Sequence, residues 1–222
     1  IITRLERMYI PDNIHVISRA SCPAWFAGKN WCQADYEETR MAALVQRFEQ
    51  SRINFDKVFI CHGILHDEQA QPEKRLEQLD PEAMAHVLRV NAITPALWLK
   101  HLLPLMKQVD CCKITLFSAR LGSISDNHLG GWYSYRASKA ALNMLLKSAA
   151  VEYARRARNV KLLAFHPGTT DTPLSRPYQA NVPDNRVLSP DFVAERLLTI
   201  LDELTPDGRL SFLDWQGRSI DW

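Results

Sequence analysis

The sequence predicts a three-layer α/β fold, in which helices cover both faces of a doubly wound parallel sheet. Short runs rich in β-branched and aromatic residues alternate along the chain with segments of helical spacing. These runs are apolar throughout and do not alternate with polar residues, as is typical of strands buried on both faces. The 222 residues contain no internal repeat or low-complexity linker, so residues 1–222 are interpreted as one domain.

The first half of the chain carries two predicted strands and three helical patterns. The chain begins within a helical pattern, because Ile2, Leu5 and Met8 recur at helical spacing. Further along, Asp80 is a suitable N-cap for a helix that has Pro81 at its first position. The remaining expectations are strands at Ile14–Ser18 and Lys57–Cys61, a helix at Tyr36–Gln50, and a helix from Asp80 to Met106 kinked or ended by Pro95 and Pro104.

The second half continues the same alternation. Ser189 is a plausible cap for the last helix, which starts at Pro190. The expected strands are Lys113–Phe117, Val160–Phe165 and Leu210–Asp214, and the expected helices are Tyr135–Arg156 and Pro190–Leu204. In open parallel sheets, ligands bind beyond the carboxyl ends of the strands, so the residues that follow each strand are the first candidates for a site.

Composition argues against several classes of protein. The chain has 27 basic and 25 acidic residues, and its basic cluster at Arg155–Arg158 suits the solvated end of a helix, so we expect no nucleic-acid partner. Five cysteines without a C-x-x-C pair, and histidines without metal-ligand spacing, predict no disulfide framework and no metal site. With no apolar run long enough to span a bilayer and no signal peptide, we expect a cytoplasmic protein without a membrane partner.

One pair of residues carries candidate chemistry. Tyr135 and Lys139 form Y-x-x-x-K at the start of the long helix, and a spacing of four places both on one helical face. A nearby ammonium favours the phenolate and lowers the pKa of a tyrosine, which ordinarily lies near ~10. Such a pair could exchange a proton with a carbonyl or an alcohol.

The run from Ser134 to Leu142 resembles the active-site helix of the short-chain dehydrogenase/reductase superfamily, and nearly the whole chain follows that family's pattern in order. The stretches Gly122–Asn127 and Gly130–Tyr133 are similar to its C-factor and sniffer-type carbonyl reductase branch. The resemblance implies a Rossmann-type fold and a cofactor site. Its expected cofactor-binding residues are Arg19, Asp35 (beside the adenine), Cys61 and Gly63 (in a turn that usually reads Asn-Ala-Gly), Asn91, Tyr135, Lys139, Pro167, Gly168, Thr170 and Thr172.

The same resemblance implies an NAD(P)-dependent oxidoreductase acting on a small-molecule carbonyl or alcohol substrate. Tyr135 would protonate the substrate oxygen in the reductive direction, Lys139 would hold the cofactor ribose and lower the pKa of the tyrosine, and Asn91 would anchor a water in a proton relay. A hydride would pass between the nicotinamide and the carbonyl carbon, because the cofactor supplies the difficult chemistry.

Arg19 points to the choice of cofactor. Arg19 directly follows the predicted strand Ile14–Ser18. An acidic residue at this position would bind the ribose 2′-hydroxyl of NAD, whereas an arginine can pair with the 2′-phosphate of NADP. We therefore expect NADP(H) to be favoured over NAD(H), the alternative being an ordinary solvent-exposed arginine.

The sequence departs from the family pattern at the catalytic serine. Ala119 stands where the second of two serines is usual, so Ser118 after a small change of register, or Ser123 from the next loop, is the candidate donor to the substrate oxygen. Losing one such donor typically costs ~10²–10³ in rate.

The family's first strand and its Gly-rich phosphate-binding turn are also missing from the sequence as it begins at Ile1. We expect these residues to exist outside the sequence given, because a sheet without its central strand would leave unpaired backbone on two neighbouring strands.

Two functions remain open after these observations. The leading one is a reductase of aldehydes or ketones, and the other is a non-catalytic nucleotide sensor or cell-signalling protein on the same fold. The segment from Thr172 to Ser189 is either an apolar lid over the substrate or a plain surface loop. The resemblance further implies a homodimer or homotetramer, formed through helices near Met84–Met106 and Tyr133–Tyr153.

Overall fold

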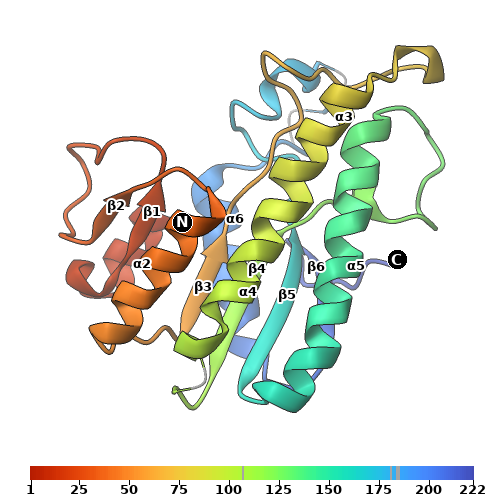
Figure 1. Cartoon of the computed structure of the whole chain (residues 1–222). Helices are drawn as coiled ribbons and strands as arrows, with labels where there is room; N and C mark the ends of the chain where they lie inside the picture. Colours follow the sequence, from red (N-terminus) through yellow and green to blue (C-terminus); the bar gives the residue numbers. More distant parts are fainter. Residues whose placement is uncertain (107, 181, 184–185) are drawn as a thin grey trace.

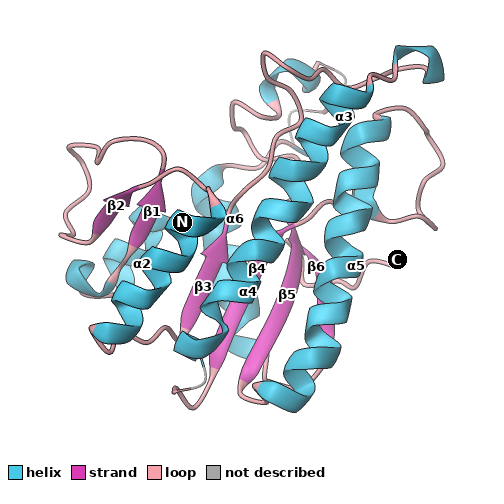
Figure 2. Ribbon diagram, in the orientation of Figure 1, coloured by secondary structure: helices cyan, strands magenta, loops and turns pink. Residues whose placement is uncertain are grey.

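The computed structural model contains a parallel sheet in two parts (Figures 1 and 2). It describes residues 1–106, 108–180, 182–183 and 186–222. The two-stranded part pairs β1 (Val16–Ser18) with β2 (Trp31–Gln33). The four-stranded part has the order β3 (Lys57–Ile60), β4 (Cys112–Phe117), β5 (Val160–His166) and β6 (Leu210–Asp214), with every neighbouring pair parallel.

Helices cover both faces of the sheet, so the predicted three-layer α/β class is confirmed (Figure 1). One layer contains α2 (Glu38–Gln50), α3 (Pro81–Leu88), α4 (Thr94–Met106) and α5 (Tyr133–Arg156), and the other contains α1 (Ile2–Met8) and α6 (Pro190–Glu203). Short 3₁₀ turns lie at Pro11–Asn13, Leu76–Gln78, Arg120–Gly122 and Arg176–Tyr178. Within the described ranges, no helix is both long enough and apolar enough to cross a membrane.

The predicted helix caps form. The side chain of Asp80 accepts a hydrogen bond from Ala83 N at 2.7 Å, and that of Ser189 accepts one from Phe192 N at 3.2 Å. Each satisfies an N–H group that has no partner within its own helix. The starts of α3 and α6 are therefore fixed by the residues that the sequence indicated.

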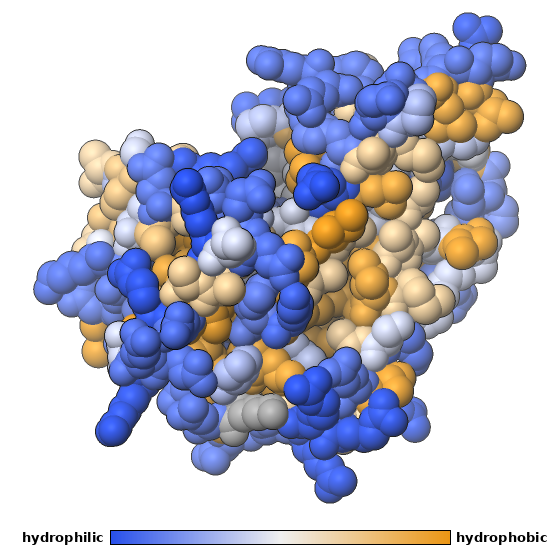
Figure 3. Space-filling model, viewed as in Figure 1, coloured by the Kyte–Doolittle hydropathy of each residue, from blue (hydrophilic) through white to orange (hydrophobic). Residues whose placement is uncertain are grey.

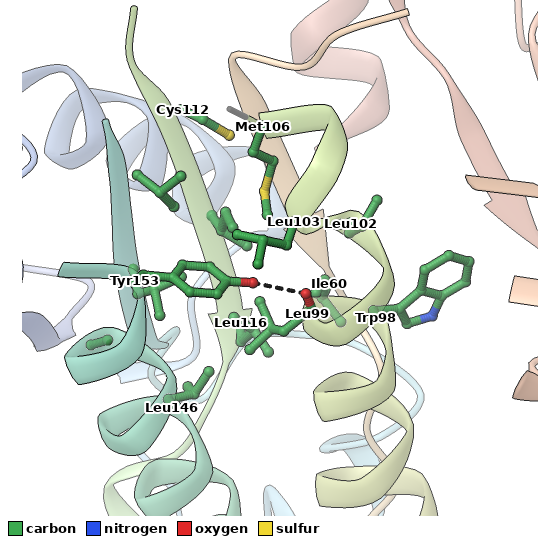
Figure 4. Close-up of a cluster of buried hydrophobic side chains, with 14 of the residues drawn as sticks. Ile60, Trp98, Leu99, Leu102, Leu103, Met106, Cys112, Leu116, Leu146 and Tyr153 are labelled. Carbon is green, nitrogen blue, oxygen red and sulfur yellow. Dashed lines mark hydrogen bonds between the residues drawn. The ribbon is translucent and has the colours of Figure 1, made fainter. Parts of the chain in front are cut away.

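The main core lies between the sheet and the layer of α2, α4 and α5 (Figure 4). Leu116 of β4 and Leu146 of α5 are almost completely buried there. Tyr153, also buried, donates its hydroxyl hydrogen to the carbonyl oxygen of Leu99 at 2.7 Å. Because this bond joins α5 to α4 inside the core, it fixes the two helices relative to one another.

Two elements differ from the sequence-based expectation. The strand Trp31–Gln33 was not predicted, because it has three residues, none fully buried, and lacks an apolar run. The helix expected from Asp80 to Met106 contains a π-helical turn at Arg89–Ile93, while Pro104 remains inside α4. Such a turn inserts an extra residue into the helix and is frequent at functional sites.

A groove of about 780 Å³ separates the two parts of the sheet. It is lined on one side by Asn13–Ser18 and on the other by Asn54–His62, with Leu5, Phe48 and Trp98 among its remaining walls. No strand of the described residues lies between β1 and β3. The groove thus occupies the place where the sequence analysis expects a further strand, and that expectation remains a prediction.

Candidate active site

The candidate site lies at the carboxyl edge of the four-stranded sheet, where a side chain from the first turns of α5 reaches the end of β4 and the loop after β3. Tyr135 and Lys139 are both buried on the inner side of α5. The Lys139 ammonium donates to the carbonyl oxygen of Phe117, the last residue of β4, at 2.8 Å, and lies 5.7 Å from the centre of the Tyr135 ring. The structure therefore brings the predicted pair together at the end of a central strand.

Gly63 allows this approach. A Cβ atom at this position would lie 3.3 Å from Lys139 Nζ and 3.9 Å from Asn91 Oδ1. Gly122, in the turn after β4, is packed still more closely, because a Cβ atom there would lie 2.8 Å from the Lys139 backbone. The two glycines let neighbouring loops pack directly against the lysine.

Burial acts in opposite directions on the two pKa values. It raises the pKa of Tyr135 and lowers the pKa of Lys139 from 10.5 to about 8. Desolvation penalises the charged form of each group, which favours a neutral phenol and a neutral amine. Burial is the cause of the shift at Tyr135, and the expectation that Lys139 lowers this pKa remains a prediction.

Tyr135 is well placed to meet another molecule. Within the described residues its hydroxyl has no hydrogen-bond partner, although the ring is buried against Leu65 and Ala119. The phenol therefore has unused capacity to donate a hydrogen bond into the site.

Asn91 lies in the π-helical turn and is completely buried. Its amide nitrogen donates to Ile64 O and Ser138 Oγ, both at 2.9 Å, and its oxygen accepts from Ile64 N at 2.8 Å. Both amide hydrogens are thus used, and one lone pair of the oxygen remains for the predicted water. The side chain joins the loop after β3 to α5.

The candidate serines do not point to Tyr135. The Ser118 hydroxyl donates to Asn143 Oδ1 at 2.6 Å. Ser123 Oγ instead accepts from Asp126 N at 3.2 Å within its own loop. Ala119 is the residue that packs with Tyr135. A change of register that would aim Ser118 into the site is not found, because residue 118 pairs its backbone N–H with Phe165 O and leaves residue 119 facing the tyrosine.

An apolar wall surrounds Tyr135. Trp132 lies with its ring centre 6.4 Å from that of Tyr135 and 5.1 Å from that of Tyr178. Leu121 and Leu174 complete the partly buried part of the same cluster. Leu174 and Tyr178 belong to the expected lid at 172–189, of which residues 181, 184 and 185 lie outside the described residues. The described part of this segment therefore packs over the candidate site.

The loop after β5 carries four of the predicted residues. Gly168 adopts a φ of +69°, where a Cβ atom would lie 2.8 Å from the Trp215 ring, so this position requires glycine. Thr170 Oγ1 donates to Pro167 O at 3.1 Å, and Thr172 Oγ1 donates to Thr170 O at 3.4 Å. The hydroxyl groups thus order the loop itself at the carboxyl edge of the sheet.

The residues predicted for the adenosine end gather beyond β1 and β2. Arg19, Asp35 and Arg40 line a hollow of about 400 Å³ together with Gln33 and Ala34. Asp35 forms an ion pair with Arg40 at 2.8 Å, while the Arg19 guanidinium lies 5.7 Å from the centre of the Tyr36 ring. Sequence reasoning missed Arg40, because nothing in its spacing distinguishes it from other exposed arginines on α2.

The turn after β3 holds Cys61 and His62 between the two ends of the site. Cys61 is an exposed, free thiol. His62 accepts a hydrogen bond at Nε2 from the Trp98 ring at 2.9 Å and lies edge-on to Tyr36. Burial lowers the pKa of His62 to about 4, so the ring is neutral and its other nitrogen carries the proton. The described residues contain no group of three His, Cys, Asp or Glu side chains that could hold a metal.

Comparison with known proteins identifies the family of the chain. The family described as short chain dehydrogenase matches residues 30–183. The C-signal protein of Myxococcus xanthus is 32% identical over 147 residues, which are 66% of this chain and 83% of that protein. A benzil reductase of Bacillus subtilis is 24% identical over 222 residues, covering 93% of this chain and 90% of that protein.

Solved structures share the fold. The carbonyl reductase Sniffer of D. melanogaster has a TM-score of 0.74 at 22% identity, covering 87% of this chain and 78% of that one. A short-chain dehydrogenase/reductase from Burkholderia multivorans with bound NADP has a TM-score of 0.72 at 24% identity, covering 87% and 77%. The resemblance found in the sequence is thereby confirmed. The chain belongs to the short-chain dehydrogenase family, in the branch that includes C-signal, and is an oxidoreductase acting on CH–OH or C=O groups.

Proposed function

We propose that the protein reduces a small carbonyl compound with NADP(H), and that Tyr135 donates the proton to the carbonyl oxygen. The observation that carries this proposal is the buried Tyr135–Lys139 pair, whose phenol has no hydrogen-bond partner among the described residues. When bound, the nicotinamide supplies the hydride. The protein's part is to hold the carbonyl oxygen against the phenol.

The protonation states of the pair suit the reductive direction. The Tyr135 phenol is protonated at neutral pH, and a protonated phenol is the form that can act as an acid. Lys139, with a pKa lowered to about 8, remains largely charged at pH 7 and favours the negative charge that develops on the phenol oxygen during transfer. Asn91 keeps the lysine in place by joining α5 to the loop after β3.

The residues at both ends of the site suit a dinucleotide. At one end, Gly63 leaves space beside Lys139 that a Cβ atom would reduce. At the other end, Arg19 and Arg40 face one hollow, and arginine is suited to bidentate recognition of a phosphate. Four solved structures with this fold are described as NADP- or NADPH-bound, which supports the choice of NADP(H) over NAD(H).

The wall around Tyr135 favours substrates with aromatic or aliphatic substituents. Leu65, Leu121, Trp132, Leu174 and Tyr178 supply its apolar surface. Binding pockets of this composition gain affinity by removing apolar surface from water. Two relatives are described as benzil reductases, and benzil carries two aromatic rings.

The first test is oxidation of NADPH in the presence of aromatic and aliphatic ketones and aldehydes. We expect turnover with at least one apolar member, and a loss of about 10²-fold or more in kcat for Tyr135→Phe, because positioned acid catalysis contributes about 10²–10⁴-fold. Tyr133→Phe, which changes a neighbouring tyrosine, should keep its kcat. Equal kcat values for Tyr135→Phe and the unaltered protein would refute the assignment.

The second test restores the missing hydroxyl. Ala119 packs with Tyr135 where the family usually has a serine, so Ala119→Ser should place a second donor near the substrate oxygen. We expect kcat to rise by up to about 10²-fold, since a single donor of this kind is worth about 10²–10³ in rate. Ser118→Ala is the matched control and should leave kcat within about threefold, because its hydroxyl is bonded to Asn143. A large fall in kcat for Ser118→Ala would identify that serine as the donor instead.

The third test concerns the cofactor. In Arg19→Asp the carboxylate would repel a 2′-phosphate, so we expect the ratio of kcat/KM for NADPH over NADH to fall by at least about tenfold. Arg47→Asp makes the same charge change on an exposed part of α2 that does not line the hollow, and it should leave the ratio unchanged. A preference for NADH in the unaltered protein would contradict the proposal.

A second candidate function is a nucleotide-binding sensor or signalling protein. The observation that favours it is Ala119, which leaves the site with one fewer donor than the family pattern. The C-signal name of one relative points in the same direction. Binding of NADPH without turnover of any compound in the panel would favour this function over the reductase.

We also propose a homodimer or homotetramer that uses α4 and α5. Apolar side chains gather on the surface over these helices (Figure 3). Met144, Leu145 and Val151 of α5 are exposed, as is Ile93 of the adjoining π-helical turn. An exposed apolar stripe of this kind is typical of a protein interface. Sedimentation velocity should show a dimer or a tetramer, and Met144→Glu should shift it toward the monomer, whereas a monomeric unaltered protein would exclude the proposal.

A further inference from the structure

A buried carboxylate outside the Tyr135–Lys139 pair reaches the catalytic helix. Glu73 lies in the long loop between β3 and α3 and is only 5% exposed. Its carboxylate accepts a hydrogen bond from Ser134 N at 3.1 Å and a second from the Ser134 hydroxyl. Ser134 directly precedes Tyr135, so Glu73 contacts α5 one residue away from the proposed proton donor.

The start of α5 needs such a contact. Gly130, Gly131 and Trp132 have φ values of +65°, +65° and +53°, so three consecutive residues adopt the left-handed region. This conformation is unfavourable for a bulky residue such as tryptophan unless the surroundings hold it. Trp132 is the N-cap, its side chain caps nothing, and the first turn of α5 contains no acidic residue. The helix therefore lacks a local device that fixes its beginning.

Glu73, 61 residues away in sequence, provides the hydrogen bonds that fix the start of α5. Its backbone oxygen accepts from Trp132 N at 2.5 Å, and its carboxylate accepts from Ser134 N. A negative charge at a helix N-terminus is stabilised by the unpaired N–H groups and the dipole of the helix. The two hydrogen bonds hold the backbone at Trp132 and at Ser134, so they fix the left-handed conformation of Trp132.

The loop that carries Glu73 does not need its carboxylate. Asp67 accepts hydrogen bonds from Gln69 N and Ala70 N, each at 2.9 Å. The Gln78 side chain accepts from Lys74 N at 2.8 Å. The loop is thus braced on both sides of Glu73, whereas every hydrogen bond found for the Glu73 carboxylate goes to α5.

We propose that Glu73 is a positioning residue for the reaction. Through Ser134 it sets the position of Tyr135, and through the backbone of Trp132 it sets the position of the Trp132 ring in the apolar wall around Tyr135. The Trp132 ring lies 6.4 Å from the Tyr135 ring, so a shift of the helix start moves both. Misplacement of a catalytic group by about 1 Å can cost about 10²-fold in rate. This inference rests on the proposed function, because it concerns the proton donor of that reaction.

The test compares Glu73→Ala and Glu73→Gln in the full chain. In Glu73→Ala we expect kcat with the best carbonyl of the panel to fall by about 10–100-fold, while the KM for NADPH stays within about threefold, since the cofactor residues are untouched. Glu73→Gln should recover most of kcat, because an amide oxygen can accept from Ser134 N. Glu77→Ala removes an exposed carboxylate of the same loop and should keep both constants.

Hydrogen exchange gives a readout that is independent of turnover. Peptides covering residues 131–138 should exchange faster in Glu73→Ala than in Glu77→Ala, while peptides covering β4 and β5 stay protected. If no variant, including the unaltered protein, turns over any carbonyl compound, the proposed function fails, and the exchange rates still decide whether Glu73 holds the helix start. Unchanged kcat in Glu73→Ala would overturn the positioning role, and so would unchanged exchange at residues 131–138.

Discussion

The buried amide of Asn91 is the interaction on which the rest of the site depends. Its hydrogen bonds tie the loop after β3, through Ile64, to α5, through Ser138. The Ser138 hydroxyl in turn donates to the backbone carbonyl oxygen of Tyr135 at 2.7 Å, which links Asn91 to the residue proposed as proton donor. Removing the amide would leave several buried polar groups without partners at once, which is more costly than losing one exposed hydrogen bond.

The long helix α5 has two chemically different halves on one inner face. Its first half buries polar side chains, and several of them find partners in other segments, as Ser134 does in Glu73 and Asn143 does in Ser118. Its second half buries apolar side chains such as Leu146 against the sheet. Polar groups are costly to bury without partners, so the first half is stable only when the loops around it are in place. The apolar half provides the packing that lets the polar half serve the site.

Helical periodicity and strand composition are local properties, which is why the sequence predicts the main helices, the four longer strands and the Tyr135–Lys139 pair. The strand at Trp31–Gln33 escapes such reasoning because pairing with β1, and not its own residues, makes it a strand. The orientation of Ser118 likewise depends on a partner 25 residues away, Asn143. Glu73 could not be found from its neighbours in sequence, because its role exists only once the loop and α5 meet. Long-range contacts therefore separate what the sequence predicts from what it does not.

The two ends of the site lie on different parts of the sheet. Arg19 and Asp35 follow β1 and β2, whereas Lys139 contacts the end of β4. Among the described residues, the packing of α2 against α4 joins the two parts that carry these ends of the site. A molecule bound at both ends would link the two parts of the sheet. By mass action, the free energy of unfolding would then rise with the concentration of that molecule.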